Sequence, residues 1–263
     1  MLKFSANLGL MWAELDLSDR TAAASRAGFK AVEFQFPYVL PAVDLAGSCE
    51  EYSVKLLGIN TNIVSGSSGH AGLGAVPGRE EGFRDLFLQA LDYADSSGAT
   101  AIHVMAGKVR DEDRRAAENT FISNLKWAVA LAASHGLTLY LEPLNTRDMP
   151  GYFYSRVEDA ARVIEAVGSA DLKLMFDAYH VGCEHENVVE RFNDLFDIIG
   201  HVQIAAVPSR AEPDEGEVDY KAFLNVVEQS GYDGWIGAEY KPRGKTEDGL
   251  HWVRTLGFDL SHS

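Results

Sequence analysis

The sequence is poor in cysteine and contains neither a long apolar run nor an apolar leader. Its two cysteines, Cys49 and Cys183, are too few and too far apart for a disulfide framework, so we expect free thiols in a cytoplasmic protein. No apolar stretch approaches the ~20 residues that cross a bilayer. The first residues also lack the apolar core of a signal peptide, so the sequence predicts no membrane partner.

Basic residues are outnumbered by acidic ones: 23 Lys and Arg stand against 39 Asp and Glu, for a formal net charge of -16. This charge repels polyphosphates, so a nucleic-acid partner would need a local basic stripe. The two basic clusters, at residues 108–115 and 241–245, are short and lie among acidic residues. They indicate solvated loops or local anion sites, and the sequence predicts no nucleic-acid partner.

Short apolar runs rich in β-branched and aromatic residues alternate along the chain with longer segments of helical periodicity, which is typical of a parallel sheet. The expected strands are residues 3–6, 31–34, 54–60, 101–104, 137–141, 172–176, 201–205 and 234–238. The expected helices are residues 18–27, 40–52, 80–97, 111–134, 156–167, 187–198, 220–229 and 246–256. The 263 residues match the size of one barrel of eight such units.

The sequence therefore predicts an α/β fold, a single (β/α)8 TIM-barrel domain over residues 1–263. A doubly wound open sheet is the alternative, but it needs a glycine-rich turn after the first strand, and residues 5–9 read Ser-Ala-Asn-Leu-Gly. Residues 61–78 are rich in Gly and Ser and have the composition of a mobile loop. In a barrel this loop lies on the active-site face, as a lid or a plain connector.

Polar residues punctuate the expected helices. Four residues can cap amino-terminal amides, namely Ser18, Asp111, Asp219 and Thr246. Five glycines can supply left-handed carboxy-terminal positions, namely Gly28, Gly98, Gly136, Gly168 and Gly231. These signals place the turns that lead from each helix into the next strand.

Four late strands each end near a residue that can bind a hard metal: Glu142, Asp177, Gln203 and Glu239. In a barrel the carboxyl ends of the strands converge on one face, where active sites are found. Carboxylate and amide oxygens suit Mg²⁺ or Mn²⁺, and three buried carboxylates would need a cation. An acid after a strand is also often a helix cap, and Asp177 is the weakest of the four on that ground.

Three further residues are candidates for contact with a substrate. His180 lies three residues after Asp177 and can reach the substrate or orient a ligand, or it is a hydrogen-bonded structural residue. His103 ends the fourth expected strand and borders the expected pocket, whereas His201 is interpreted as structural and deeper in the barrel. Arg210 can bind a substrate carboxylate bidentately, or it is an exposed loop residue.

At these residues the sequence resembles the hydroxypyruvate isomerase family, within the wider xylose-isomerase-like barrel superfamily. The resemblance covers nearly the whole chain and includes Leu141-Glu142-Pro143-Leu144-Asn145, Asp177-Ala178-Tyr179-His180, Gly200-His201-Val202-Gln203-Ile204-Ala205 and Gly237-Ala238-Glu239-Tyr240. Gln203 favours this branch, because the sugar-epimerase branch usually carries histidine as its third ligand. The resemblance implies that Glu142, Asp177, Gln203 and Glu239 bind the metal, and that His180 and Arg210 contact the substrate.

The resemblance also implies the reaction, in which Glu142 and Glu239 move a proton between adjacent carbons through an enediolate. A small hydroxy-carbonyl compound is the expected substrate, with hydroxypyruvate and 2-hydroxy-3-oxopropanoate (tartronate semialdehyde) as the pair interconverted. The alternatives are an isomerase or 3-epimerase of a four- to six-carbon keto sugar or of a 2-oxo-tetronate, a metal-dependent phosphoesterase, and a barrel that binds a small acid without turning it over. Whether copies of the chain form a homo-oligomer is left open by the sequence.

Overall fold

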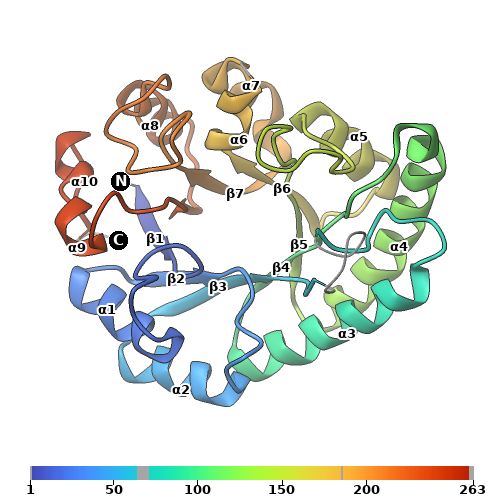
Figure 1. Cartoon of the computed structure of the whole chain (residues 1–263), viewed down its shortest axis with the longest axis horizontal. Coiled ribbons are helices and arrows are strands. Elements are labelled where there is room, and N and C mark those ends of the chain that lie inside the picture. Colours follow the sequence, from blue (N-terminus) through green and yellow to red (C-terminus); the bar gives the residue numbers. More distant parts are fainter. Residues whose placement is uncertain (1, 64–70, 185, 261–263) are drawn as a thin grey trace.

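The protein is described by a computed structural model that covers residues 2–63, 71–184 and 186–260. Eight parallel strands close into a barrel in chain order, with the last strand paired to the first (Figure 1). The strands are β1 (Lys3–Asn7), β2 (Ala31–Phe34), β3 (Lys55–Asn60), β4 (Ala101–His103), β5 (Thr138–Leu141), β6 (Leu172–Asp177), β7 (Ile199–Ile204) and β8 (Trp235–Ala238). The expected barrel is confirmed, and the open-sheet alternative is wrong.

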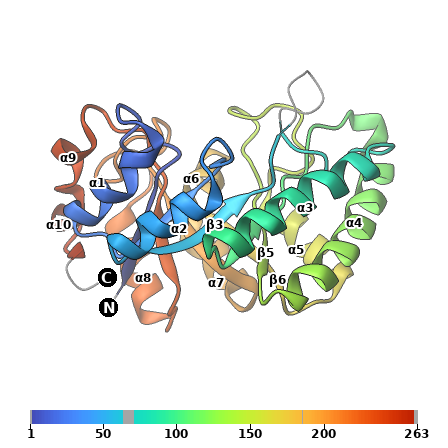
Figure 2. The same cartoon turned by 90° about the horizontal axis from the view of Figure 1, so that it is seen from below.

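Helices surround the barrel, and Figure 2 shows α2, α3 and α4 side by side along its outside. The α-helices are α1 (Arg20–Ala27), α2 (Ala42–Glu51), α3 (Glu80–Ser97), α4 (Arg114–Ser134), α5 (Val157–Val167), α6 (Ala178–Cys183), α7 (Val188–Leu195), α8 (Tyr220–Gln229), α9 (Thr246–Gly249) and α10 (Trp252–Thr255). Three short 3-10 helices are η1 (Leu17–Asp19), η2 (Asp111–Asp113) and η3 (Phe196–Ile198). The apolar faces of the α-helices pack against the strands and form the main core with them.

The expected helix ends are correct at the glycines and at one of the four caps. All five glycines have positive φ, the conformation in which a side chain is strained. Asp219 caps α8, because its carboxylate accepts a hydrogen bond from the backbone amide of Ala222 at 2.9 Å. The caps expected at Ser18, Asp111 and Thr246 are wrong, since none of these side chains bonds a helix amide at the start of its helix.

Thr246 instead connects the first and last strand–helix units of the barrel. Its hydroxyl accepts a hydrogen bond from the backbone amide of Trp12 at 2.7 Å, so the loop after β1 is tied to the loop after β8. The single helix expected at residues 246–256 is wrong as well, because the chain forms two short helices, α9 and α10. Trp252, the first residue of α10, packs edge-on against Phe4 of β1.

Part of the glycine-rich loop after β3 lies among the described residues. Residues 64–70 of the loop expected at residues 61–78 lie outside the described residues, so the lid prediction stays untested. Gly72 pairs with Ala106, and the amide of Gly74 bonds the carbonyl of Met105 at 3.1 Å. This part of the loop therefore packs on the segment after β4. Within the described ranges, no helix combines the length and apolar character needed to cross a membrane.

Candidate active site

The four expected metal ligands lie together at the carboxyl ends of β5 to β8. Asp177 ends β6 and stands beside Gln203 on β7, while Glu142 and Glu239 directly follow β5 and β8. All four side chains are buried, with exposed fractions between 2% and 5%. Glu142, Gln203 and Glu239 line a cavity of about 480 Å³ inside the barrel. The parallel strands therefore gather residues nearly a hundred positions apart into one polar pocket.

Three of these residues each present a buried oxygen without a hydrogen-bond partner in the described part of the chain. The oxygens are Oε1 of Glu142, Oδ2 of Asp177 and Oε1 of Gln203. A buried polar atom left alone costs free energy, so such atoms are typical of a site that binds something. Oxygen donors of this kind fit a hard divalent cation, and the residues present are therefore chemically suited to Mg²⁺ or Mn²⁺.

The two carboxylate oxygens of Asp177 have different surroundings. Its Oδ1 accepts a hydrogen bond from the backbone amide of Tyr179 at 2.8 Å and so caps α6, a helix that the sequence did not reveal. Its second oxygen is free to face the pocket. The helix-cap interpretation and the ligand interpretation of this residue are thus compatible, because each uses a different oxygen.

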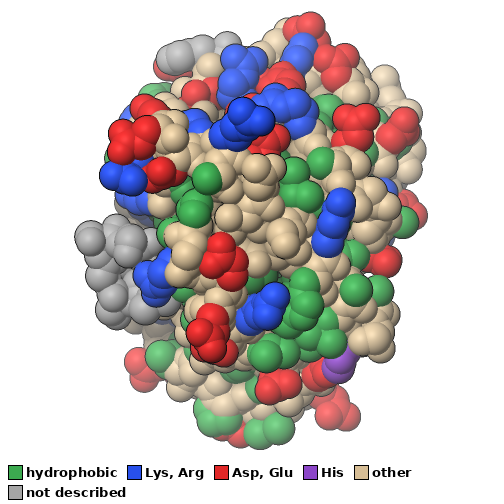
Figure 3. All heavy atoms as spheres, turned by 90° about the vertical axis from the view of Figure 1, so that its right-hand side faces the viewer, with side chains coloured by type: hydrophobic (Ala, Val, Ile, Leu, Met, Phe, Trp, Pro, Cys, Tyr) green, Lys and Arg blue, Asp and Glu red, His purple; other side chains and the backbone are tan. Residues whose placement is uncertain are grey.

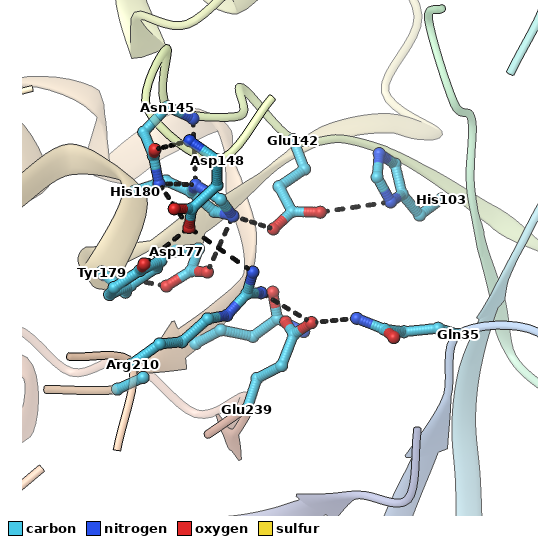
Figure 4. Close-up of polar contacts among 12 residues, drawn as sticks. Gln35, His103, Glu142, Asn145, Asp148, Asp177, Tyr179, His180, Arg210 and Glu239 are labelled. Carbon is cyan, nitrogen blue, oxygen red and sulfur yellow. Dashed lines mark hydrogen bonds and ion pairs between the residues drawn. The ribbon is translucent and has the colours of Figure 1, made fainter. Parts of the chain in front are cut away.

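His180 lies against the same carboxylates (Figure 4). Its Nε2 is 3.7 Å from Oε1 of Glu142 and 3.6 Å from Oδ2 of Asp177, and the three residues form a group whose ligand atoms could surround a metal ion. However, Nδ1 of His180 accepts a hydrogen bond from the backbone amide of Asn145 at 3.0 Å. Burial holds the pKa of His180 well below its usual value, so the ring is neutral.

A neutral imidazole that accepts at Nδ1 carries its proton on Nε2. The nitrogen of His180 that faces the pocket is therefore an N–H donor and has no lone pair for a metal. His180 therefore differs from the carboxylates beside it, which each present a free oxygen among the described residues. The substrate contact expected from the sequence stays a prediction, with which an N–H donor is compatible.

His103, at the end of β4, closes another side of the pocket. Its Nδ1 lies 3.3 Å from Oε2 of Glu142, and burial lowers the pKa of the imidazole to about 3. The ring is therefore neutral and contributes hydrogen-bonding capacity without adding charge. As expected, His103 borders the cavity.

Arg210 points into the acidic pocket from the loop after β7 (Figure 4). Its Nη2 is 3.2 Å from Oε1 of Glu239, and its guanidinium lies over the ring of Tyr179, 4.9 Å from the centroid. Its φ of 58° lies in the left-handed region, which is uncommon for a side chain other than glycine. Backbone hydrogen bonds of 2.7 Å to Ala206 and from Lys241 hold that conformation. Arg210 is thus a fixed, largely buried cation and not an exposed loop residue.

The carboxyl groups of the pocket bind protons more tightly than usual. Burial raises the pKa of Asp177 to about 6 and that of Glu239 to about 8, although the charge of Arg210 acts in the opposite direction on both. Burial, followed by repulsion from Glu239 and Asp177, raises the pKa of Glu142 well above its usual value. Groups shifted toward neutral pH are suited to taking up and returning protons.

Sequence reasoning missed several polar residues of the pocket. Gln35, which directly follows β2, donates a hydrogen bond from Nε2 to Glu239 and so fixes that carboxylate. Asp148 accepts from the hydroxyl of Tyr179 at 2.5 Å and lies 4.0 Å from Arg210. Gln35 follows β2 and Asp148 lies between β5 and α5, and neither carries a local signal that separates it from an ordinary loop residue.

Glu33 was also missed, although its position gave a signal: it is the single charged residue inside the apolar strand β2. Its carboxylate accepts hydrogen bonds from Ser5 and from Nε2 of Gln203, and it lies 3.1 Å from Nε2 of His201. Burial acts to raise the pKa of Glu33, but the charge and hydrogen bond of His201, with the other two hydrogen bonds, hold it below its usual value. His201 lies deeper than the metal ligands, as expected.

Comparison with known proteins gives full-length matches. The profile of the family described as xylose isomerase-like TIM barrel matches residues 21–256. The chain is 43% identical over 255 residues to the 2-oxo-tetronate isomerase of Cupriavidus necator, covering 97% of this chain and 98% of that protein. It is 36% identical over 256 residues to the hydroxypyruvate isomerase of Escherichia coli, covering 96% and 98%.

A solved structure has nearly the same fold. The crystal structure described as AP endonuclease, family 2, from Brucella melitensis superposes with a TM-score of 0.93 at 39% identity, over 97% of this chain and 98% of that one. The similarity extends over nearly the whole of both chains.

Proposed function

The chain belongs to the xylose isomerase-like TIM barrel family and is an isomerase, and we propose that it interconverts hydroxypyruvate and 2-hydroxy-3-oxopropanoate with bound Mg²⁺ or Mn²⁺. The relatives with named substrates act on small keto acids, which supports this class of substrate. One observation carries the proposal: Glu142 and Glu239 are buried in one pocket, beside the fixed cation Arg210.

The reaction moves a carbonyl from one carbon to its neighbour without loss or gain of atoms. One glutamate removes a proton from C3 of hydroxypyruvate and leaves an enediolate across C2 and C3. A proton is returned to C2, and the hydroxyl proton on the C3 oxygen is transferred to the C2 oxygen, so C3 becomes the aldehyde. Two buried carboxyl groups that face one pocket can take up and return these protons.

The proposed cation would be held by Glu142, Asp177, Gln203 and Glu239, of which three present unpartnered buried oxygens among the described residues. When bound, a divalent cation supplies Lewis-acid stabilisation of the negative charge that develops on the substrate oxygens. The cation and the three carboxylates would compensate one another's charge, which lowers the cost of burying both.

The remaining residues orient the substrate. The Nε2–H of His180 donates to a substrate oxygen, where a neutral donor stabilises developing negative charge. The guanidinium of Arg210 binds the substrate carboxylate with two parallel hydrogen bonds. Tyr179 supports Arg210 from beneath, because the guanidinium stacks on its ring.

A four-carbon 2-oxo-tetronate is the second candidate substrate. The Cupriavidus necator protein of that name is 43% identical to this chain. Both compounds carry a carbonyl at C2 and a hydroxyl at C3, so the same residues serve both. A phosphoesterase acting on nucleic acid is disfavoured by the net charge of -16, and the face in Figure 3 carries acidic and basic side chains side by side.

The test is proton NMR in D₂O on metal-stripped enzyme, with hydroxypyruvate and 2-oxo-tetronate in separate samples, before and after addition of Mn²⁺ or Mg²⁺. We expect metal-dependent conversion of at least one acid by the wild type. We also expect that Glu142→Gln and Glu239→Gln each abolish conversion, while one of them still exchanges the C3 proton of hydroxypyruvate with deuterium. That variant retains the base that acts on hydroxypyruvate.

Either of two results would overturn the proposal. Conversion of neither acid, with metal present, would remove the keto-acid substrate and leave keto-sugar epimerisation or plain binding. Full activity in the presence of a strong chelator would remove the metal requirement.

A further inference from the structure

The side-chain amide of Gln203 carries a donor, Nε2, and an acceptor, Oε1, and only the donor has a hydrogen-bond partner within the described residues. Nε2 donates a hydrogen bond to Oε2 of Glu33 at 2.9 Å. Oε1 is buried and has no hydrogen-bond partner within the described residues. A rotation of the amide by 180° about its last bond would exchange the two atoms and place the NH₂ group where Oε1 now lies.

Glu33 determines which of these two orientations the Gln203 amide adopts. An ionised carboxylate only accepts hydrogen bonds, so the end of the Gln203 amide that faces it must be the NH₂ group. Glu33 is itself fixed on its other oxygen by the hydroxyl of Ser5 and by Nε2 of His201, which lies at 3.1 Å. These contacts come from two other strands, β1 and β7, so the carboxylate is held in place independently of Gln203.

The neighbouring strand leaves room for this contact. Gly237 on β8 stands beside Gln203, and a Cβ atom there would lie 2.5 Å from Oε1 of Glu33 and 2.9 Å from Cγ of Gln203. Gly237 does not have a positive φ, so its backbone conformation does not require glycine. Space for the Glu33–Gln203 pair is the remaining physical reason for a glycine in this strand.

We propose that Glu33 is a positioning residue of the metal centre, which holds the Gln203 amide in the one orientation that leaves Oε1 available as a ligand. The inference rests on the proposed function, because it assumes that Gln203 binds a cation. Without Glu33 the amide is free to turn, and its NH₂ group, a donor that cannot bind a cation, occupies the ligand position part of the time. Partners that orient metal ligands typically contribute 10- to 100-fold to affinity.

The experiment is a double-mutant cycle with Mn²⁺ as the probe, read by titration calorimetry at one fixed pH. Glu33→Gln keeps the shape of the side chain but can present either end of its own amide. We expect it to weaken Mn²⁺ binding by about 10- to 100-fold in the wild-type background. In the Gln203→Ala background the same substitution should change the affinity by less than about twofold, because no amide remains to be oriented.

A matched control separates orientation from loss of a buried charge. Glu212 is another buried carboxylate on the same side of the barrel, paired with Arg243 at 2.8 Å and absent from the cavity wall. Glu212→Gln should leave Mn²⁺ affinity unchanged. Thermal melting without metal shows which variants are folded, and any folded variant is informative.

The outcomes distinguish the two proposals. If the wild type itself binds no Mn²⁺, the metal centre is wrong. If the wild type binds Mn²⁺ but Glu33→Gln binds it equally well, or weakens it equally in both backgrounds, then Glu33 does not act through Gln203 and the positioning role is wrong while the metal centre stands.

Discussion

The backbone amide of Asn145 donates a hydrogen bond to Nδ1 of His180 over 3.0 Å, and this contact fixes which nitrogen of the imidazole carries the proton. The side-chain amide of Asn145 lies against the same nitrogen at 2.7 Å, so two donors converge on it. His180 therefore presents Nε2–H to the carboxylates of Glu142 and Asp177. By proximity alone it would be counted among the metal ligands.

His180→Ala should therefore separate catalysis from metal binding. We expect kcat to fall by about 10²- to 10³-fold, the usual loss when one donor to developing negative charge is removed. Mn²⁺ affinity should change by less than about threefold, because a protonated nitrogen is not a ligand. Steady-state kinetics and titration calorimetry on the same preparations measure both; a loss of affinity as large as that of Asp177→Ala would show that His180 is a ligand after all.

Arg210→Lys should weaken the use of substrates that carry a carboxylate. Lysine keeps the charge but loses the planar pair of donors, and a hydrogen bond to a charged group contributes about 1.5–3 kcal/mol, or roughly 10- to 100-fold in kcat/KM. Dihydroxyacetone is a matched control, since it replaces the carboxylate of hydroxypyruvate with a hydroxymethyl group. An equal loss with both compounds would argue against carboxylate recognition by Arg210.

The metal-free protein should lose stability as the pH rises. The pKa of Asp177 is raised to about 6 and that of Glu239 to about 8, above the value of about 4 expected in the unfolded chain. The folded state therefore binds these protons more tightly, and their stabilising contribution is complete below about pH 4 and lost as the pH rises through 6 and then 8. Melting curves in a chelator from pH 5 to 9 should show a falling melting temperature.

Bound Mn²⁺ should oppose this fall of the melting temperature with rising pH. Mn²⁺ competes with protons for the same oxygens, so both its affinity and its stabilising effect should rise over the same pH range. Glu239→Gln lacks the group that titrates near pH 8 and should show a shallower loss in chelator. A wild type whose melting temperature is level over this range would mean that the carboxyl groups are not coupled to folding as described.

Gly237→Ala should disturb the metal centre from within β8, two residues before Glu239. The added Cβ would meet Glu33 and Gln203 at 2.5 Å and 2.9 Å, and overpacking of this kind costs about 1–3 kcal/mol of stability. Gly244→Ala is the matched control, since a Cβ there meets nothing within 4 Å and φ is not positive. Chemical denaturation and Mn²⁺ titration of the two variants should differ, and identical behaviour would argue that the space at Gly237 is unimportant.

The sequence predicted the barrel and the four residues at the ends of its late strands because those signals are local. Alternation of short apolar runs with helical segments defines the strands, and a polar residue at the end of each is visible without knowledge of any partner. Helix boundaries were less accurate where competing contacts intervene. The hydroxyl of Thr246, for example, bonds the amide of Trp12 across 234 positions and does not cap its own helix.

The chain's own pattern thus determined the fold class, the face that carries the site and the residue types gathered there. Only the tertiary structure decided how each group is used. The proton position on His180 depends on an amide 35 positions away, and the orientation of Gln203 depends on a carboxylate 170 positions away. The physical reason is that hydrogen-bond direction and desolvation depend on neighbours in space, and closure of the barrel brings those neighbours together from strands far apart in the sequence.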